Sequence, residues 1–308
     1  MIDWSERINC GARLEPVDGV LHGAGQSPDA LREYTQAVGS AYEPAVFMTY
    51  MRVKKLQPGA LQRRLDEYNG IVRSGEAVVQ IGLSMTSDGS PELRYEHEVA
   101  DGLHDEALRC FCRQLAEYGK PVFLRIGYEF NGHWNGYQPE PFVAAWRRIC
   151  KMMDEYELDN VARVWCYAPD GADNPWMPYY PGDELVDWWS IDLFSASHMT
   201  MPETAAFIAE ALEHRKPVMI GESTPRYCGV NGGDASWNEW YKPYFELIRS
   251  SANMKAFCYI NWDWSGYPKW HDWGDGRIQE NRQVLESYRR EMACSQYLHA
   301  NSGWLKNV

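Results

Sequence analysis

Short apolar runs alternate with amphipathic helical patterns along almost the whole chain, and this alternation constrains the fold more than any other feature. Runs that are apolar throughout are typical of strands buried on both faces, as in a parallel sheet. Eight runs rich in Val, Ile and aromatic residues predict strands at Gly19–His22, Ala45–Tyr50, Ala77–Leu83, Pro121–Gly127, Val161–Tyr167, Trp188–Phe194, Pro217–Gly221 and Ala256–Trp262.

Helical patterns with apolar residues spaced by three and four lie between these runs. They predict helices at Pro28–Val38, Leu61–Ser74, Glu106–Tyr118, Pro141–Tyr156, Pro202–His214 and Trp237–Ser250. The first begins with "SPDAL", a capping serine followed by proline at the first helical position. Strands that alternate with helices in this number predict an α/β fold, a (β/α)8 TIM barrel.

An open, doubly wound α/β sheet is the structural alternative to the barrel. Such a sheet normally carries a glycine-rich phosphate fingerprint after its first strand, and "HGAGQSP" does not supply one. The sequence has no linker, low-complexity tract or internal repeat. We therefore expect a single domain over residues 1–308, with 281–308 forming a C-terminal helix and tail packed outside the barrel.

Charge and composition exclude several classes of partner. The net charge of −13 opposes binding to nucleic acid, and no uninterrupted apolar run is long enough to span a membrane. The eight cysteines are scattered within apolar runs, which predicts reduced, buried thiols without a disulfide framework. The first residues, "MIDWSERINCGARLEP", lack the apolar run of a secretory signal. This predicts a cytoplasmic protein, or a secreted one if a leader has been removed.

The aromatic content is high, with 14 Trp and 19 Tyr, and many of these residues stand in polar, glycine- or proline-containing segments. Examples are "NGHWNGY", "DNPWMPYYPGDE" and "WDWSGYPKWHDWGDG". Pyranose faces stack on indole rings while sugar hydroxyls bind amides and carboxylates, so these segments favour a carbohydrate-binding cleft.

Two glutamates follow predicted strands at corresponding places. Glu129 comes just after the fourth strand in "PVFLRIGYEFNGHWNGY", and Glu222 comes just after the seventh in "PVMIGESTPRY". Barrel enzymes carry their chemistry at the carboxyl ends of the strands. Two carboxylates on one cleft can cleave a glycosidic bond, since one donates a proton and the other attacks or activates water.

The segment "RIGYEFNGHW" resembles the strand-four motif of glycoside hydrolase family 26, and "KPVMIGES" and "CYINWDW" resemble its strands seven and eight. The resemblance implies a retaining enzyme in which Glu129 is the acid/base and Glu222 the nucleophile. It also implies that Arg125 keeps the nucleophile ionised, and that Trp262 or Trp264 lies under the sugar at the cleavage site.

The sequence departs from the family pattern at several positions, which indicates an outlying branch. Tyr128 replaces the usual histidine before the acid/base, Phe194 stands where a tyrosine is common, and Glu222 is followed by Ser-Thr-Pro-Arg. The predicted substrate-binding residues are Arg125, Tyr128, Asn131, Trp134, His198, Arg226, Trp262 and Trp264.

The predicted function is a retaining glycoside hydrolase acting on β-linked oligo- or polysaccharides, with no cofactor and no metal. Mannan is the first expected substrate, and β-1,3-xylan or β-glucan are alternatives. A non-catalytic carbohydrate-binding barrel is a second alternative. A metal-dependent sugar enzyme is a third, for which Glu129, Asp192, His198, Glu222 and Asp263 are the available ligands. Linkage, internal or terminal cleavage, and oligomeric state stay open.

Overall fold

The computed structural model describes residues 6–72, 77–87 and 90–307, and a parallel sheet dominates it. Its strands are β1 (Val20–Gly25), β2 (Val46–Arg52), β3 (Val78–Ser84), β4 (Val122–Ile126), β5 (Val161–Tyr167), β6 (Trp188–Leu193), β7 (Val218–Ser223), β8 (Met254–Ile260) and β9 (Tyr297–Leu298). The strand order is β2-β3-β4-β5-β6-β7-β8-β1-β9, and β1 also pairs with β2. Because the order returns to its start, the first eight strands form the predicted (β/α)8 barrel.

The helices follow the strands as the alternation predicts. They are α1 (Pro28–Val38), α2 (Ala60–Asp66), α3 (Glu96–Ala100), α4 (Asp105–Tyr118), α5 (Pro139–Glu155), α6 (Pro202–Glu213), α7 (Asp234–Ser236), α8 (Lys242–Ser250) and α9 (Arg282–Met292). The prediction of α1 is confirmed at both ends, since Ser27 accepts the Ala30 N–H at its N-cap and Gly39 follows its last turn.

Several elements differ from the prediction, among them the three-residue helix α7, which was not predicted. The helix expected over Leu61–Ser74 ends at Asp66, and positions 73–74 of that expectation lie outside the described residues. The helix expected over Trp237–Ser250 contains a π-helical segment at Trp237–Tyr241 before α8 begins. The short helix α3 and the two-residue strand β9 were not predicted.

The chain divides into two compact units. Unit 1 comprises residues 1–48, 70–77 and 192–308, and unit 2 comprises residues 49–69 and 78–191. Strands β2 and β6 contain residues of both units. The expectation of one domain over 1–308 stays a prediction.

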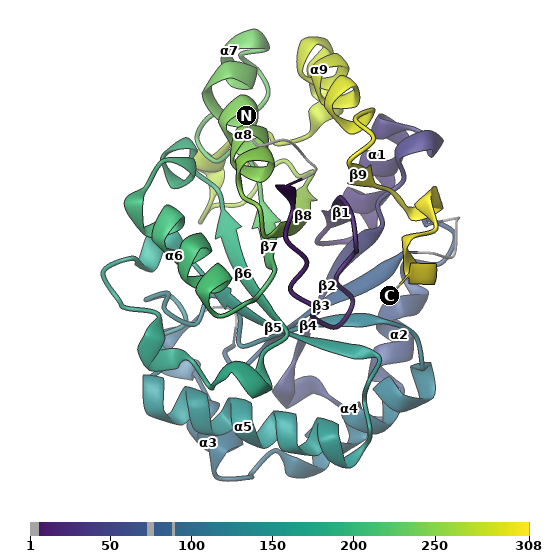
Figure 1. Cartoon of the computed structure of the whole chain (residues 1–308). Helices are drawn as coiled ribbons and strands as arrows, with labels where there is room; N and C mark the ends of the chain where they lie inside the picture. The colour runs from purple at the N-terminus through teal and green to yellow at the C-terminus, as the bar shows by residue number, and fades with distance from the viewer. Residues whose placement is uncertain (1–5, 73–76, 88–89, 308) are drawn as a thin grey trace. The chain divides into compact units, whose positions relative to one another are not determined.

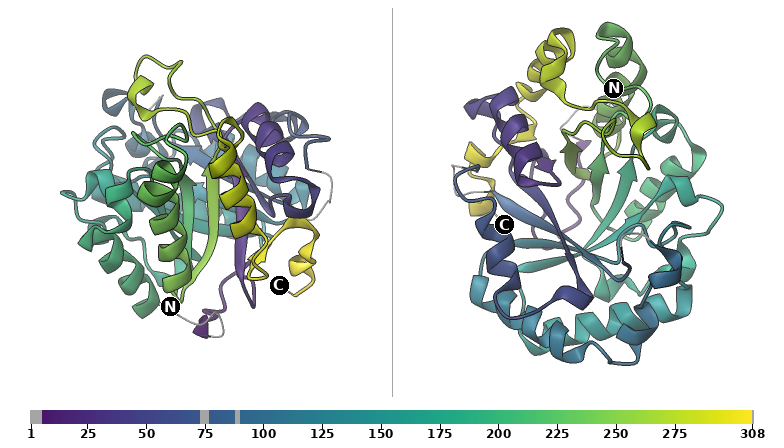
Figure 2. Two further views of the ribbon diagram at one scale, coloured as in Figure 1. Left: turned by 90° about the horizontal axis from the view of Figure 1, so that it is seen from above. Right: turned by 180° about the vertical axis from the view of Figure 1, so that it is seen from behind.

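Unit 1 is organised around a buried aromatic core. The rings of Tyr34, Tyr241, Tyr259 and Tyr288 have no exposed surface and pack on one another. Helices α1 and α9 lie side by side (Figures 1 and 2), and β9 pairs with β1 in parallel. The C-terminal segment therefore adds a strand to the sheet as well as the expected helix.

Unit 2 contains helices α2, α3, α4 and α5 beside its part of the sheet, where β3 pairs with β4, β4 with β5 and β5 with β6. Helices α3 and α5 lie side by side along one edge of Figure 1, and α4 packs on α5. Phe130, which directly follows Glu129 in the loop after β4, stacks on Trp165 with ring centroids 4.3 Å apart. That contact fixes the loop after β4 to the core of the same unit.

All eight cysteines are free thiols, five of them buried. Among the described residues, no helix has both the length and the apolar character needed to cross a membrane.

Candidate active site

The backbone after β4 turns sharply at the first predicted catalytic residue. Gly127 has a φ of 54° and Glu129 has a φ of 53°, so both lie in the left-handed region. A glutamate there is held at a cost of about 1–3 kcal/mol, which the surrounding contacts must offset. A Cβ at Gly127 would come within 2.7 Å of the Phe142 ring, so glycine is required at this position for space as well as conformation.

Two asparagines hold this turn in place. The Asn135 side chain donates to the carbonyls of Tyr128 and Glu129 at 3.0 and 3.1 Å. Asn131 donates to the carbonyls of Ala168 and Gly171, both at 2.8 Å, and accepts the Ala168 N–H at 2.9 Å. Asn131 is fully buried and both its amide hydrogens bind main-chain carbonyls. Its observed role is therefore to join the loops after β4 and β5, which differs from the predicted sugar contact.

The Glu129 carboxylate is oriented by Trp134. The indole N–H donates to Glu129 Oε2 at 2.6 Å, a short charge-assisted bond if the carboxylate is ionised. Gly132 makes this possible, because a Cβ there would lie 2.4 Å from the Trp134 ring. The spacing Glu-x-x-Gly-x-Trp thus folds the indole back over its own loop.

Arg125, in β4, packs against Tyr128 at the start of this turn. Arg125 has no exposed surface, donates from Nη2 to Cys166 Sγ at 3.0 Å, and lies with its guanidinium 5.0 Å from the Tyr128 ring centroid. Its burial removes it from direct sugar contact, whereas Tyr128 is half-buried and also packs against Tyr50. The predicted support of the nucleophile by Arg125 stays a prediction.

The other predicted catalytic residue lies inside the carboxyl end of β7. Glu222 is the fifth residue of that strand and 9% exposed. The two residues after it are tied to β8, since Ser223 Oγ donates to the Cys258 carbonyl at 2.8 Å and Thr224 Oγ1 donates to the Ile260 carbonyl at 3.2 Å. The side chain of Glu222 is therefore carried by rigid strand rather than by a loop.

The two strand-eight tryptophans occupy different environments. Trp264 is 8% exposed, donates to Thr224 Oγ1 at 3.3 Å and packs on Trp273. Trp262 keeps an intermediate exposure, while its indole N–H is buried and has no hydrogen-bond partner among the described residues. Trp264 is thus a core residue of its loop, and Trp262 is the one with an available ring surface.

Arg226 is enclosed by aromatic rings. Its guanidinium carbon lies 5.0 Å from the Tyr227 ring centroid and 5.1 Å from that of Trp273. It donates to Ser195 Oγ from Nη2 at 2.6 Å. His198, which is 2% exposed, accepts the Phe194 N–H at Nδ1 and lies with Nε2 3.4 Å from Arg226 Nη2. Arg226 and His198 therefore belong to one cluster between the loops after β6 and β7.

Several residues of these arrangements were not predicted as site residues, namely Asn135, Cys166, Ser195, Tyr227 and Trp273. Tyr227 is 62% exposed and has a φ of 69°, an unusual backbone state for an aromatic residue. In the sequence only its position next to Arg226 in "STPRY" indicated that Tyr227 belongs to the site. No group of three or more His, Cys, Asp or Glu side chains within the described ranges could hold a metal ion.

Comparisons with known proteins show which sequences this chain is similar to. The sequence pattern of glycosyl hydrolase family 26 matches residues 95–225, a range that contains Arg125, Glu129, Trp134 and Glu222. A β-1,3-xylanase of a Vibrio species is 26% identical over 93% of this chain and 67% of its own length. A mannan endo-1,4-β-mannosidase of Bacillus subtilis is 26% identical over 54% of this chain and 43% of its own length.

Solved structures share the fold. The catalytic domain of an endo-β-1,4-mannanase from Bacillus sp. JAMB-750 superposes with a TM-score of 0.64 at 17% identity, covering 93% of this chain and 89% of that chain. A modular endo-β-1,4-mannanase from Cellulomonas fimi has a TM-score of 0.64 at 16% identity, covering 92% of this chain and 72% of that chain. With its barrel and with residues 95–225 matching glycosyl hydrolase family 26, this chain is a glycoside hydrolase similar to the members of that family.

Proposed function

We propose that the protein hydrolyses β-linked polysaccharides or oligosaccharides with retention of configuration. In the first step Glu222 attacks the anomeric carbon and a glycosyl–enzyme ester forms, while Glu129 gives its proton to the departing glycosidic oxygen. In the second step Glu129 takes a proton from water, the water oxygen bonds to the anomeric carbon, and Glu222 leaves as a carboxylate.

The placement of each glutamate supports its role. Glu129 is aimed by the Trp134 N–H at 2.6 Å and stands on a turn whose conformation disfavours a side chain, which is typical of a position kept for function. Glu222 is carried within β7 and flanked by the Ser223 and Thr224 bonds to β8. Both are at the carboxyl ends of parallel strands, where barrel enzymes place their catalytic groups.

The remaining site residues supply candidate sugar contacts. Trp262 is the strand-eight indole with available ring surface, on which a pyranose face can stack. Tyr128 and Trp134 are half-buried beside Glu129. The enclosed Arg226 and His198 hold the loop that carries Tyr227 and so act on a ligand through that ring.

We put β-1,3-xylan first as the substrate. The relatives that extend over nearly the whole chain are β-1,3-xylanases from Vibrio and Alcaligenes species, each 26% identical over 93% and 94% of this chain. Mannan, the first expectation from the sequence, becomes the second candidate, because the mannosidase match covers only 54% of the chain.

Hydrolysis of defined oligosaccharides tests this proposal. The protein is incubated with β-1,3-xylo-, β-1,4-manno- and mixed-linkage β-gluco-oligosaccharides, and the anomer first released is followed by NMR. We expect cleavage of the xylo series with the β anomer appearing first. Appearance of the α anomer first contradicts the double displacement, and binding without cleavage of any of these glycans favours the non-catalytic barrel.

Two variants separate the roles of the glutamates. We expect E129A to lower kcat on natural glycans by about 10²–10⁴-fold, because proton transfer to a poor leaving group is lost. A substrate with an activated leaving group, such as a dinitrophenyl glycoside, restores the first step in E129A but not in E222A. Equal losses on both substrates in both variants would contradict this assignment. Activity that disappears with chelator and returns with a divalent metal would favour the metal-dependent alternative.

A further inference from the structure

A series of aromatic rings leads away from Trp262 along the loop that follows β8. The ring centroids of Trp262 and Tyr267 lie 6.2 Å apart, those of Tyr267 and Trp270 lie 6.1 Å apart, and those of Trp270 and Trp273 lie 6.2 Å apart. The three tryptophans are half-buried, and Tyr267 is 41% exposed. Single exposed rings are ordinary, whereas contiguous aromatic surface of this kind marks an interaction site.

Tyr227 extends this series from the loop after β7. Its backbone N–H donates to the Trp273 carbonyl at 3.0 Å, and the Arg226 guanidinium carbon lies 5.0 Å from one ring centroid and 5.1 Å from the other. Tyr227 is 62% exposed at a φ of 69°, so the chain accepts an unfavourable backbone conformation for a ring that gains little burial. We call Trp262, Tyr267, Trp270, Trp273 and Tyr227 the aromatic row.

Trp264 holds the aromatic row in place. It is only 8% exposed, and its ring centroid lies 6.3 Å from that of Tyr267, 5.9 Å from that of Trp270 and 5.0 Å from that of Trp273. Its backbone N–H donates to the Gly274 carbonyl at 3.1 Å, which closes the loop on itself. Rings that are already ordered lose little conformational entropy when a ligand binds, so this loop is prepared for binding.

The aromatic row begins beside the strand that carries Glu222, and both belong to unit 1. Strand β8 ends two residues before Trp262 and pairs with β7 in parallel. The Thr224 hydroxyl donates to the Ile260 carbonyl at 3.2 Å, which joins the carboxyl ends of the two strands. A glycan that reacts at Glu222 and stacks on Trp262 would therefore continue over the rest of the aromatic row.

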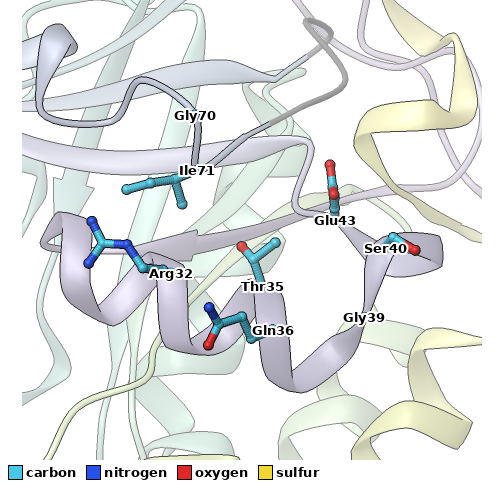
Figure 3. A pocket seen from close by; sticks show the side chains of 8 residues that line it. All are labelled: Arg32, Thr35, Gln36, Gly39, Ser40, Glu43, Gly70 and Ile71. Carbon is cyan, nitrogen blue, oxygen red and sulfur yellow. The ribbon is translucent and has the colours of Figure 1, made fainter.

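The pocket of about 320 Å³ against helix α1 is less suited to a sugar ring. Figure 3 shows its lining, which includes Arg32, Gln36 and Glu43, and none of the described residues that line it is aromatic. Sugar faces stack on aromatic rings, so the loops after β7 and β8 offer the better surface.

We propose that the aromatic row binds the sugar units of a β-linked glycan beyond the one at the cleavage site, each by stacking of its apolar face on a ring. This inference rests on the hydrolysis proposed above and assigns Tyr227, Tyr267 and Trp270 to substrate binding. The exposed polar residues between the rings, such as Lys269 and Asp272, supply partners for sugar hydroxyls. Longer chains cover more rings, so the enzyme should favour them.

The dependence of kcat/KM on chain length tests the proposal. The parent, Y227A and Y267A are compared on the oligosaccharide series that the parent cleaves best, from the disaccharide to the hexasaccharide. We expect each variant to lose about two- to ten-fold more kcat/KM on the hexasaccharide than on the disaccharide, the range for the loss of one ring contact. Equal losses along the whole series overturn the proposal.

Y118A is the matched control. Tyr118 is a half-buried tyrosine in the last turn of α4, near the amino end of β4 and thus at the end of the strands opposite to the catalytic one. Y118A should keep the chain-length dependence of the parent. A Y118A enzyme that loses this dependence as Y267A does would mean that the rings of the aromatic row have no special part in it, and the proposal falls.

Binding separates this inference from the proposed hydrolysis. In the E222A background, isothermal titration with each hexasaccharide should give a Kd about two- to ten-fold higher when Tyr227 or Tyr267 is also replaced by alanine. If the parent cleaves no glycan but this difference in Kd is found, the hydrolysis fails and the aromatic row stands. If the parent cleaves glycans and the variants change neither Kd nor chain-length dependence, the aromatic row alone fails. A Y267A variant that instead changes the molecular mass measured by light scattering makes the row a contact between copies of this chain and overturns the proposal.

Discussion

The orientation of Glu129 depends on its own backbone conformation and on two residues that follow it closely in the sequence. The turn takes its left-handed conformation at Glu129 itself, Gly132 leaves room for an indole, and Trp134 returns its N–H to the carboxylate at 2.6 Å. A carboxylate free to rotate would reach the glycosidic oxygen in only some of its rotamers. The Trp134 hydrogen bond selects one oxygen and one rotamer, so it is the contact on which proton transfer most depends.

We therefore expect W134F to lower kcat about ten- to a hundred-fold. Phenylalanine keeps the ring packing and removes the N–H, and a hydrogen bond to a charged group contributes about 1.5–3 kcal/mol. Steady-state kinetics on the best oligosaccharide measures this. The control is W237F, the same chemical change in the π-helical segment, where activity should be unchanged. A W134F enzyme as fast as the parent would contradict the orienting role.

A substitution at Gly132 also tests the contact between Trp134 and Glu129, because it displaces the indole without changing Trp134 itself. A Cβ built on it lies 2.4 Å from the Trp134 ring, a distance that real contacts do not allow. We expect G132A to displace the indole and to reduce kcat by a factor similar to that of W134F, with little further loss in the double variant. Losses that multiply in the double variant would mean that the two residues act independently.

At the scale of elements, the short helix α3 supplies a side chain that caps the N-terminus of the longer helix α5. Glu96 at the start of α3 is fully buried, and its Oε1 accepts the Gln138 N–H at 3.2 Å, just before the first turn of α5. A carboxylate at a helix N-terminus satisfies an orphan N–H and interacts favourably with the helix dipole. Arg94 Nε, 3.2 Å from the same oxygen, adds a paired charge.

We expect E96A to destabilise the protein by roughly 1–3 kcal/mol, the cost of leaving a buried donor unpaired. Denaturant unfolding followed by tryptophan fluorescence measures this. E92A, a change of the same type at an exposed position four residues earlier, should stay within about 0.5 kcal/mol of the parent. If E96A unfolds at the same denaturant concentration as E92A, the carboxylate is not the cap of α5.

Elements with regular periodicity were predictable, and those shaped by tertiary contacts were not. Strand β5 was predicted with both its ends because six of its seven residues are apolar or aromatic. Strand β1 runs on to Gly25, beyond its predicted end at His22, because Gly23 packs where a Cβ would lie 2.5 Å from Cys258 Sγ. In the sequence the glycines of this strand indicate a loop. In the barrel a larger residue at Gly23 would clash with the neighbouring strand β8.

Strand β8 was predicted to begin two residues late for a different reason. Lys255 reads as a solvent-exposed residue, yet it is fully buried, donates to the Pro16 carbonyl at 3.2 Å and lies 3.6 Å from Glu15. No pattern in the strand reveals a partner some 240 positions away. The same limit applies to Asn131, since its motif suggested a ligand contact while its hydrogen bonds go to backbone that only the fold brings near.

At the scale of the whole molecule, one buried network joins the first strand to the last residues of unit 1. The Nδ1 atoms of His22 on β1 and His299 lie 2.9 Å apart. His22 Nε2 lies 2.5 Å from the Tyr34 hydroxyl, and His299 Nε2 donates to the Met292 carbonyl at 2.9 Å. With His299 protonated at Nε2, its Nδ1 accepts the His22 Nδ1–H, so the network is complete when both rings are neutral.

This network makes stability depend on pH. Burial, with a smaller effect of His299, holds the pKa of His22 well below its ordinary value of 6.5, and burial also lowers the pKa of His299. Below about pH 6.5 the unfolded chain takes up protons at these two rings that the folded chain refuses. The stabilisation is therefore complete above that pH and is lost progressively as the pH falls toward the folded-state pKa values.

We expect the free energy of unfolding to fall on acidification from pH 7 to pH 5, with each histidine contributing up to about 1.4 kcal/mol per pH unit. H299Q keeps a hydrogen-bonding side chain and removes one titrating group whose pKa is lowered by burial, so its slope should be smaller than that of the parent. Carboxylates whose pKa is lowered by partners, such as Asp105 beside Arg148, lose their contribution only at lower pH. Denaturant titrations at pH 7, 6 and 5 therefore report mainly on the histidines. If the free energy of unfolding depends on pH equally in the parent and in H299Q, the buried pair of His22 and His299 does not cause the loss of stability in acid.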